Sequence, residues 1–285
     1  MTEAPDVALS VDSLTKDFKT RGPATRGVAP TMHRAVDSVS LTLVKGEILG
    51  LAGASGSGKT TLARCIVRLI EPDTGHVKLG GTDVTQARGK QLRMLRRRIQ
   101  MIFQDPYASL NPRLTVASAL TEVGRVHRRP GSEDSEAFVR NLLQQVHLAS
   151  GTASRRPNEL SGGQRQRVAI ARALAAGPEV LIADEAVSAL DVSIQAQLLN
   201  LFLDLRDEIG LSILFVTHQL AVLAAVADRI AIMQDGRIVE SADSTSIFRN
   251  PQHAYTRALI DAHPHANPRL RFDARELPTS AEVNA

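Results

Sequence analysis

The sequence predicts an α/β fold in which helices cover both faces of a parallel β-sheet. Residues 180–183 form a fully apolar run of the kind that a buried strand shows, and residues 212–216 form a second predicted strand. Helical patterns follow these strands at residues 194–209 and 219–227. A glycine-rich turn also joins the apolar run 48–52 to a helical pattern. Strands that alternate with helices are typical of a parallel sheet.

Composition limits the class of protein. A chain of 285 residues can bury a full core, as one large domain or two small ones. We expect no membrane span and no signal peptide, because no apolar run approaches ~18 residues and the N-terminus lacks a basic region followed by an apolar one. The net charge of +4 is too small to argue for nucleic acid. Cys65 is the single cysteine, so an intrachain disulfide is excluded and burial in a helix is expected.

Local patterns predict the elements before the apolar strands. Residues 7–14 and 36–44 alternate apolar and polar side chains as edge strands do, and residues 19–33 between them indicate a loop. Residues 75–81 indicate a short strand and turn. A helix at 86–98 then leads to a strand at 99–103. These segments predict a β-rich N-terminal part.

The helix predicted at 86–98 carries four arginines: Arg93, Arg96, Arg97 and Arg98. Leucines at helical spacing lie between them, so the simplest interpretation is an amphipathic helix with a solvated cationic face. Nucleic-acid binding is the weaker alternative, since no stacking aromatic residues accompany the run. Residues 114–154 then show a polar-rich helical pattern, which marks a candidate inserted subdomain, and residues 164–176 indicate another helix.

The glycine-rich turn carries a phosphate-binding motif. It reads G-x-x-x-x-G-K-[ST] without a mismatch, between a predicted strand and a predicted helix. Glycines let the backbone form a nest of N–H donors, and the following helix adds its positive end. Lys59 is expected to reach the outer phosphates, and the Thr60 hydroxyl to ligate Mg²⁺. The predicted nucleotide-binding residues of this loop are Gly53, Ser55, Gly56, Ser57, Gly58, Lys59, Thr60 and Thr61.

Two acidic residues end the apolar strand at 180–183. Asp184 and Glu185 lie at its carboxyl end, where ligands bind in open α/β sheets. Successive side chains at a strand end point in different directions. We therefore expect Asp184 to hold Mg²⁺ through its water shell and Glu185 to face the attacking water as a general base or orienting group. The alternative is an acidic helix N-terminus that the helix dipole stabilises.

A second candidate anion site lies at the start of the helix predicted at residues 164–176. Ser161, Gly162, Gly163 and Gln164 place a hydroxyl and backbone donors at a helix start. One protein seldom needs two such cradles for one nucleotide, and a serine N-cap with two flexible glycines is the simpler alternative. Ser-Gly-Gly-Gln between a phosphate loop and an acidic strand end resembles the signature of the ATP-binding cassette (ABC) ATPases. The resemblance covers nearly everything from residue 7 to about 263.

The resemblance implies roles for further residues. In the family the signature segment binds the γ-phosphate of a nucleotide held by the phosphate loop of a second subunit. His218 matches the switch histidine that contacts the γ-phosphate, although a strand-terminal histidine is more often structural. Gln104 matches the glutamine that senses Mg²⁺ and water. Phe18 stands where the family places its adenine-stacking aromatic. Asp191 matches a residue that contacts the other subunit, or it is only a helix cap.

Three segments narrow the resemblance. Residues 104–112 and 184–195 look like the oligopeptide, dipeptide and nickel importer branch. Residues 250–256 are similar to the tail motif of that branch, with Ala254 where proline is usual. Arg156 stands where the branch commonly has an aromatic residue. These departures weaken the assignment of the transported solute, but they lie outside the ATPase motifs.

The resemblance implies a P-loop NTPase core with a parallel sheet, an antiparallel β-subdomain and a helical subdomain at about residues 105–176. The ABC ATPase domain is expected at 7–245, followed by a C-terminal extension at 246–285 whose last ~20 residues are expected to be poorly ordered. A groove near residues 104–111 is expected to accept a short permease helix.

The implied function is the ATP-hydrolysing, nucleotide-binding subunit of an ABC importer on the cytoplasmic face of the cell membrane. The importer would take up peptides, a nickel chelate or another small solute. Its other components would be a second cassette, the same chain or a related one, two membrane permease subunits and, indirectly, an extracytoplasmic solute-binding protein, with no nucleic acid. The alternative is a soluble cassette without a transport function, for example an accessory protein of phosphonate metabolism.

Overall fold

A six-stranded sheet forms the centre of the protein. The structure is a computed structural model that describes residues 6–20, 31–105, 110–129, 131–132, 134–188 and 190–262. The strand order is β10-β9-β3-β8-β7-β6. Neighbours from β9 to β6 pair in parallel, and β10 is an antiparallel edge strand. The bounds are β3 (Ile48–Ala52), β6 (Ile99–Ile102), β7 (Val180–Asp184), β8 (Ser212–Val216), β9 (Arg229–Gln234) and β10 (Arg237–Asp243).

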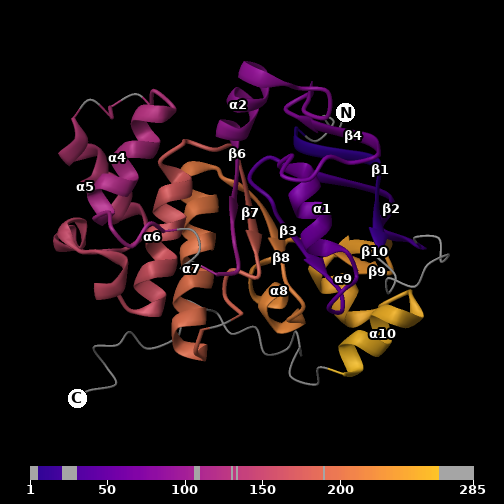
Figure 1. The fold of residues 1–285 in the computed structure, drawn as a ribbon. Coiled ribbons are helices and arrows are strands. Elements are labelled where there is room, and N and C mark those ends of the chain that lie inside the picture. Colours follow the sequence, from indigo (N-terminus) through magenta and orange to yellow (C-terminus); the bar gives the residue numbers. More distant parts are fainter. Residues whose placement is uncertain are drawn as a thin grey trace, which may run out of the picture.

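Both faces of this sheet are buried, as the apolar strands predict. Leu49 and Leu51 of β3 belong to one apolar cluster, whereas Ile48 and Ala52 belong to the other. Strands β7 and β8 alternate between the two clusters in the same way. This period of two is the signature of a strand whose side chains pack on both sides. The parallel sheet of the predicted α/β fold is confirmed (Figure 1).

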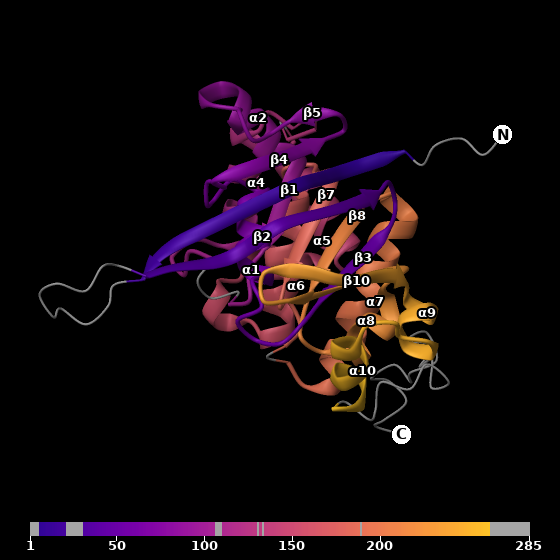
Figure 2. The same ribbon diagram turned by 90° about the vertical axis from the view of Figure 1, so that its right-hand side faces the viewer.

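A small antiparallel sheet and helix α1 (Lys59–Ile66) cover one face of the large sheet. The order of the small sheet is β2-β1-β4-β5. Figure 2 shows its two long strands crossing in front of the large sheet. Its strands are β1 (Val7–Thr20), β2 (Thr31–Val44), β4 (Thr74–Leu79) and β5 (Thr82–Asp83). This sheet is the predicted antiparallel β-subdomain.

Two expectations for this part were wrong in detail. Strand β1 is not an edge strand, because it pairs with β2 on one side and β4 on the other. Its alternation arises from a more polar and exposed face: Leu9 and Val11 are buried, whereas Asp12 is exposed. The loop expected at 19–33 is shorter, since its two ends belong to β1 and β2. Residues 21–30 lie outside the described residues.

Helices cover the other face of the large sheet and extend beyond it. Helices α4, α5 and α6 gather at one side in Figure 1, and short 3-10 turns η1 and η2 lie between α5 and α6 in the sequence. These elements form the predicted helical subdomain. Their bounds are α4 (Val116–Val126), α5 (Ser135–Gln145), η1 (Ser150–Ser154), η2 (Pro157–Glu159) and α6 (Gly162–Leu174).

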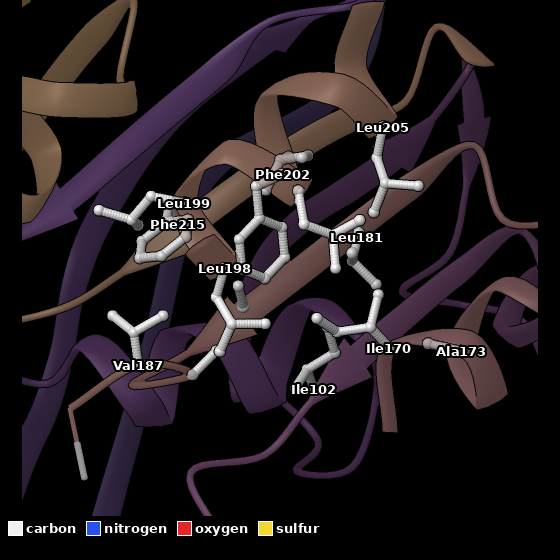
Figure 3. Close-up of a cluster of buried hydrophobic side chains, with 14 of the residues drawn as sticks. Ile102, Ile170, Ala173, Leu181, Val187, Leu198, Leu199, Phe202, Leu205 and Phe215 are labelled. Carbon is white, nitrogen blue, oxygen red and sulfur yellow. The ribbon is translucent and has the colours of Figure 1, made fainter. Parts of the chain in front are cut away.

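The remaining helices are α2 (Gly89–Arg98), α7 (Val192–Ile209), α8 (Leu220–Val226), α9 (Ser244–Arg249) and α10 (Ala254–Asp261). Helix α7 packs on β8 through Phe202 and Phe215, whose rings meet edge to face with centroids 5.2 Å apart (Figure 3). The sequence had not predicted the elements after residue 228: β9, β10, α9 and α10. Among the described residues no helix is long and apolar enough to cross a membrane.

Helix α2 is amphipathic, as expected: Leu95 is buried, Arg93 and Arg96 are exposed, and Arg97 and Arg98 are half-buried. Three of the arginines also bind neighbouring elements. Arg96 donates to the carbonyl oxygen of Arg68 and Arg97 to that of Ala176. Arg98 forms two hydrogen bonds, of 2.6 and 2.7 Å, with the carboxylate of Glu179. Their guanidinium groups therefore fasten α2 to the ends of neighbouring elements, which periodicity alone does not reveal.

Candidate nucleotide-binding site

Four parallel strands lead into segments that carry predicted site residues. Strand β3 leads into the glycine loop, β6 into Gln104, β7 into Glu185 and β8 into His218. Because the strands are parallel and in register, their carboxyl ends meet at one edge of the sheet. A pocket of about 430 Å³ lies there. It is lined by Phe18, His33, Ala35, Ser55, Gly56, Gly58, Lys59, Thr60, Thr61, Gln104, Glu185 and His218.

The loop between β3 and α1 requires glycine at two positions. Gly53 has φ +154° and Gly58 has φ +103°, which side chains disfavour. A Cβ at Gly53 would lie 2.1 Å from the carbonyl oxygen of Met233, and a Cβ at Gly58 would lie 2.1 Å from that of Ala35. The loop is therefore pressed between β2 and β9, which keeps its backbone close to the pocket.

Lys59 is held by the loop itself. Its Nζ donates to the carbonyl oxygens of Gly53 at 2.7 Å and Ala54 at 2.9 Å. Burial lowers the pKa of Lys59, and the nearby carboxylates of Glu185 and Asp184 oppose this effect. The ammonium group of Lys59 is thus held by two carbonyl oxygens. Because Lys59 also lines the pocket, it can bind an anionic ligand there.

Asp184 and Thr60 have a geometry that fits Mg²⁺. The Thr60 hydroxyl donates to Oδ1 of Asp184 at 3.0 Å. Burial raises the pKa of Asp184, and this hydrogen bond opposes the shift. The described residues contain no cluster of three or more His, Cys, Asp or Glu side chains that could hold a metal alone. One hydroxyl and one carboxylate beside a phosphate loop are typical of Mg²⁺, which takes its other ligands from phosphates and water.

Glu185 and His218 form a hydrogen-bonded pair. Nδ1 of His218 lies 2.8 Å from Oε1 of Glu185. A carboxylate can only accept, so this bond places the imidazole proton on Nδ1. Oε2 of Glu185 is buried without a hydrogen-bond partner. Glu185 also has φ +51°, a left-handed conformation that costs a non-glycine residue free energy. A strained carboxylate with an unpartnered oxygen is suited to receive a polar ligand such as water.

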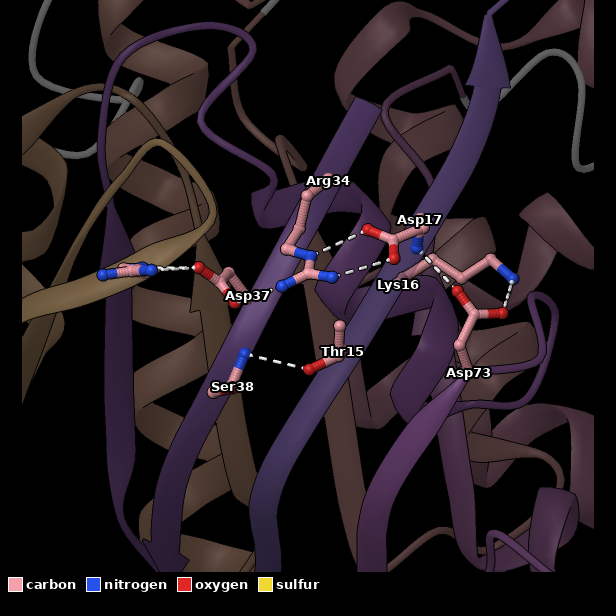
Figure 4. A network of polar contacts seen from close by, with 8 residues as sticks. Thr15, Lys16, Asp17, Arg34, Asp37, Ser38 and Asp73 are labelled. Carbon is pink, nitrogen blue, oxygen red and sulfur yellow. Dashed lines mark hydrogen bonds and ion pairs between the residues drawn. The ribbon is translucent and has the colours of Figure 1, made fainter. Parts of the chain in front are cut away.

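Phe18 stands at the mouth of the pocket opposite His33 in the β1–β2 pair. Its side chain is 37 % exposed, and Nζ of Lys16 lies 5.6 Å from the ring centroid. A polar network fixes the strands beside it: Arg34 pairs with Asp17 and Asp37, and Lys16 pairs with Asp73 (Figure 4). The sequence had not predicted the pocket residues His33 and Ala35, because residues up to 33 indicate a loop.

The signature residues lie apart from this pocket. In the described part of the chain, neither Ser161–Gln164 nor Asp191 lines it. Ser161 and Gln164 cap each other at the start of α6, through bonds of 3.1 and 3.3 Å. Asp191 caps α7 by accepting from the N–H of Ile194 at 3.0 Å. A Cβ on Gly163 would lie 2.6 Å from Cγ2 of Ile194, so the two helix starts are adjacent.

Comparisons with known proteins agree with this geometry. The family model "ABC transporter" matches residues 36–188, and the model "Oligopeptide/dipeptide transporter, C-terminal region" matches residues 239–284. The chain is 47% identical, over 98% of its length and 78% of the relative's, to a probable peptide ABC transporter ATP-binding protein of Sinorhizobium fredii. It is 48% identical to the glutathione import ATP-binding protein GsiA of Pectobacterium atrosepticum, over 92% of this chain and 42% of that protein.

Solved structures are similar as well. A dimeric post-hydrolysis state of the ATP-binding cassette MJ0796, bound to ADP and Pi, matches with a TM-score of 0.71 and 29% identity, over 83% of this chain and 98% of that chain. CbiO1 from Clostridium perfringens, part of the ABC transporter complex cbiONQ, shares the fold with a TM-score of 0.74 and 24% identity, over 91% of this chain and 97% of that chain. The chain belongs to the ABC transporter family and is one of its ATP-hydrolysing cassettes.

Proposed function

We propose that this cassette powers the uptake of peptides or a similar small solute as the nucleotide-binding subunit of an importer. The observation that carries the proposal is the likeness along 98% of the chain to a relative named for peptide transport, together with the matching C-terminal region. The alternative function, a soluble cassette without a role in transport, is not favoured, because the relatives are named for peptide transport and for glutathione import. We divide the chain into an ATPase domain at 7–245, with the helical subdomain at about 105–176, and a C-terminal extension at 246–285. Residues 263–285, which include the last ~20 residues where disorder was expected, lie outside the described residues.

We assign each pocket residue a role in ATP binding. The N–H groups of the glycine loop and the Lys59 ammonium group bind the phosphates, and Phe18 stacks on adenine. Thr60 and Asp184, with Gln104, hold Mg²⁺, which neutralises phosphate charge when it is bound. The geometry that supports these roles is the 3.0 Å contact of Thr60 with Asp184 and the place of Lys59 and Gln104 in one pocket wall.

Hydrolysis is assigned to Glu185 and His218. The unpartnered Oε2 of Glu185 orients the attacking water and accepts its proton. His218 keeps the carboxylate in this position through its Nδ1 hydrogen bond of 2.8 Å. Its side chain also lines the pocket, so we assign its Nε2 to the γ-phosphate. Lys59 stabilises the charge that develops on the phosphate oxygens. Each group is held by a neighbour before the substrate arrives, which lowers the cost of organising the site.

A complete site requires a second cassette, either a second copy or a related chain. Ser161, Gly162, Gly163 and Gln164 then contact the nucleotide in the partner's pocket, and Asp191 contacts the partner's surface. The position of these residues outside this chain's own pocket supports the arrangement. Two pockets related head to tail would each combine one loop with one signature segment. The similar MJ0796 cassette was solved as a dimer.

Two permease subunits would receive the mechanical work at the cytoplasmic face of the membrane, where we place this chain as a peripheral subunit. A hollow of about 130 Å³ beside β6 is suited to a short apolar helix. Phe103 and Val123 line it, and Phe103 is 38 % exposed. The groove expected at 104–111 lies partly outside the described residues, since 106–109 are not described. An extracytoplasmic binding protein would deliver the solute.

Purification from detergent extracts of native membranes tests this function. A tag on the N-terminus of the chain should bring down an integral membrane protein in constant ratio, and a Phe103→Asp variant should lose it while the free variant still binds ATP. Recovery of the chain without any integral membrane partner would exclude the transporter role and favour the soluble cassette.

A further inference from the structure

The C-terminal helix α10 reaches the phosphate loop. Tyr255 lies in the first turn of α10, and its Oη accepts a hydrogen bond of 3.0 Å from the backbone N–H of Ala54. The two residues are 201 positions apart in the sequence. Ala54 belongs to the loop between β3 and α1, whereas Tyr255 does not line the nucleotide pocket. The extension therefore contacts the loop from its outer side.

Other contacts hold α10 in place independently of this bond. The carboxylate of Glu240 on β10 accepts from the N–H groups of Gln252 at 2.8 Å and His253 at 3.0 Å. His253 caps α10 by accepting from the N–H of Tyr255 at 3.2 Å. The side chains of Tyr255 and Ile260 pack against the larger apolar cluster. The Tyr255 hydroxyl is thus presented from a fixed position, as α9 and α10 lie together at one corner of the molecule (Figure 1).

One peptide group connects Tyr255 with Lys59. The N–H bound by Tyr255 belongs to the peptide between Gly53 and Ala54, and the carbonyl oxygen of that same peptide accepts from Nζ of Lys59 at 2.7 Å. In a trans peptide the N–H and C=O point in opposite directions. Tyr255 and Lys59 therefore hold opposite sides of one peptide plane, and a rotation of that plane would break both bonds.

The backbone preferences of Gly53 restrain this peptide weakly. Gly53 has no side chain and a φ of +154°, so its own backbone preferences admit several orientations of the following peptide. Ala54, Ser55 and Gly56 are exposed. The hydrogen bond that the Ala54 N–H donates to the Tyr255 hydroxyl is the restraint that selects the orientation in which the carbonyl faces Lys59.

We propose that Tyr255 is a positioning residue for ATP binding, because it fixes the Gly53–Ala54 peptide and thereby holds Lys59 at the pocket. The C-terminal extension is then a working part of the nucleotide site. The inference rests on the proposed function, in which Lys59 binds the phosphates of ATP.

The variant Tyr255→Phe tests this role, because it removes Oη and keeps the ring that packs on the core. In full-length protein, the Kd for MgATP should rise about three- to tenfold, the effect of one hydrogen bond. The kcat should fall by no more than a similar factor, since Lys59 also stabilises charge during hydrolysis whereas Glu185 is left in place. The matched control is Ile260→Val, which trims the same helix where it packs on the core and should leave the Kd unchanged. The Kd is measured by displacement of a fluorescent ATP analogue.

A double-mutant cycle with Lys59→Met separates positioning from a general structural effect. If Tyr255 acts through Lys59, Tyr255→Phe should not change the MgATP Kd in the Lys59→Met background. Two outcomes overturn the proposal: wild-type affinity in Tyr255→Phe, or an equal loss of affinity with and without the Lys59 ammonium group. Failure of the wild-type chain to bind MgATP would instead refute the proposed function, so the two failures are distinguishable.

Discussion

Replacing Glu185 by Gln should remove hydrolysis and leave the fold intact. The substitution removes the carboxylate charge but keeps the size of the side chain and its contact with His218. A general base contributes ~10²–10⁴-fold to a rate, so the ATP turnover of the purified cassette should fall by that factor. Binding of MgATP and pairing of cassettes should persist, because neither depends on proton transfer.

The structure also gives the expected stability of this variant. Gln keeps the strained backbone of φ +51° and leaves one polar atom unpartnered, as Glu185 does. The free energy of unfolding should therefore change by less than ~1 kcal/mol, since no packing or backbone term is altered. Glu185→Gly would relieve ~1–2 kcal/mol of left-handed strain, but it also loses one hydrogen bond worth ~0.5–1.5 kcal/mol and adds chain flexibility. We expect its stability to lie close to that of the wild type.

Glu179→Gln is the matched control. It makes the same chemical change directly before β7, whereas Glu185 directly follows that strand. Steady-state phosphate release should stay within about twofold of wild type in the control, because Glu179 pairs with Arg98 outside the pocket. Turnover above about a tenth of the wild-type rate in Glu185→Gln would refute its role as the base, since a base contributes ~10²-fold or more.

Two further predictions concern single titratable groups. Burial raises the pKa of the Cys65 thiol to about 11, so iodoacetamide at pH 8 should label it only after unfolding; rapid labelling of the folded chain would contradict its burial. Burial opposes ionisation of Glu240, but the N–H groups of Gln252 and His253 hold its pKa below the usual range. Its stabilising effect is complete above about pH 4.3 and is lost as the pH falls through the folded pKa. Glu240→Gln should therefore destabilise the chain at pH 7 more than at acidic pH in urea unfolding, and an equal loss at both would argue against this anchor.

The sequence predicted the parts of the site that local patterns determine. The glycine loop, Asp184, Glu185 and His218 each follow an apolar strand directly, so strand ends and motif spacing place them at one edge of a parallel sheet. The central strands 180–183 and 212–216 were predicted nearly to the residue for the same reason.

Contacts between distant segments were not predictable in this way. His33 reaches the pocket only because β2 continues further back than its alternating pattern suggests. Arg96 and Arg97 bind backbone carbonyls, which no side-chain pattern records. Tyr255 meets Ala54 across 201 residues, through two strands and two helices that the sequence had not predicted. A polar side chain that binds a backbone atom needs no particular residue type as its partner. A single sequence therefore cannot reveal such a contact.

The central claim is that Lys59 of one cassette and Ser161 of another act on the same nucleotide. Mixing a Lys59→Ala variant with a Ser161→Phe variant tests it most directly, because each variant alone has no intact site. In a random mixture half of the dimers would carry one intact site of two, so we predict about one quarter of wild-type ATPase activity. Activity no higher than that of the separate variants would contradict the claim that two copies complete each other's sites.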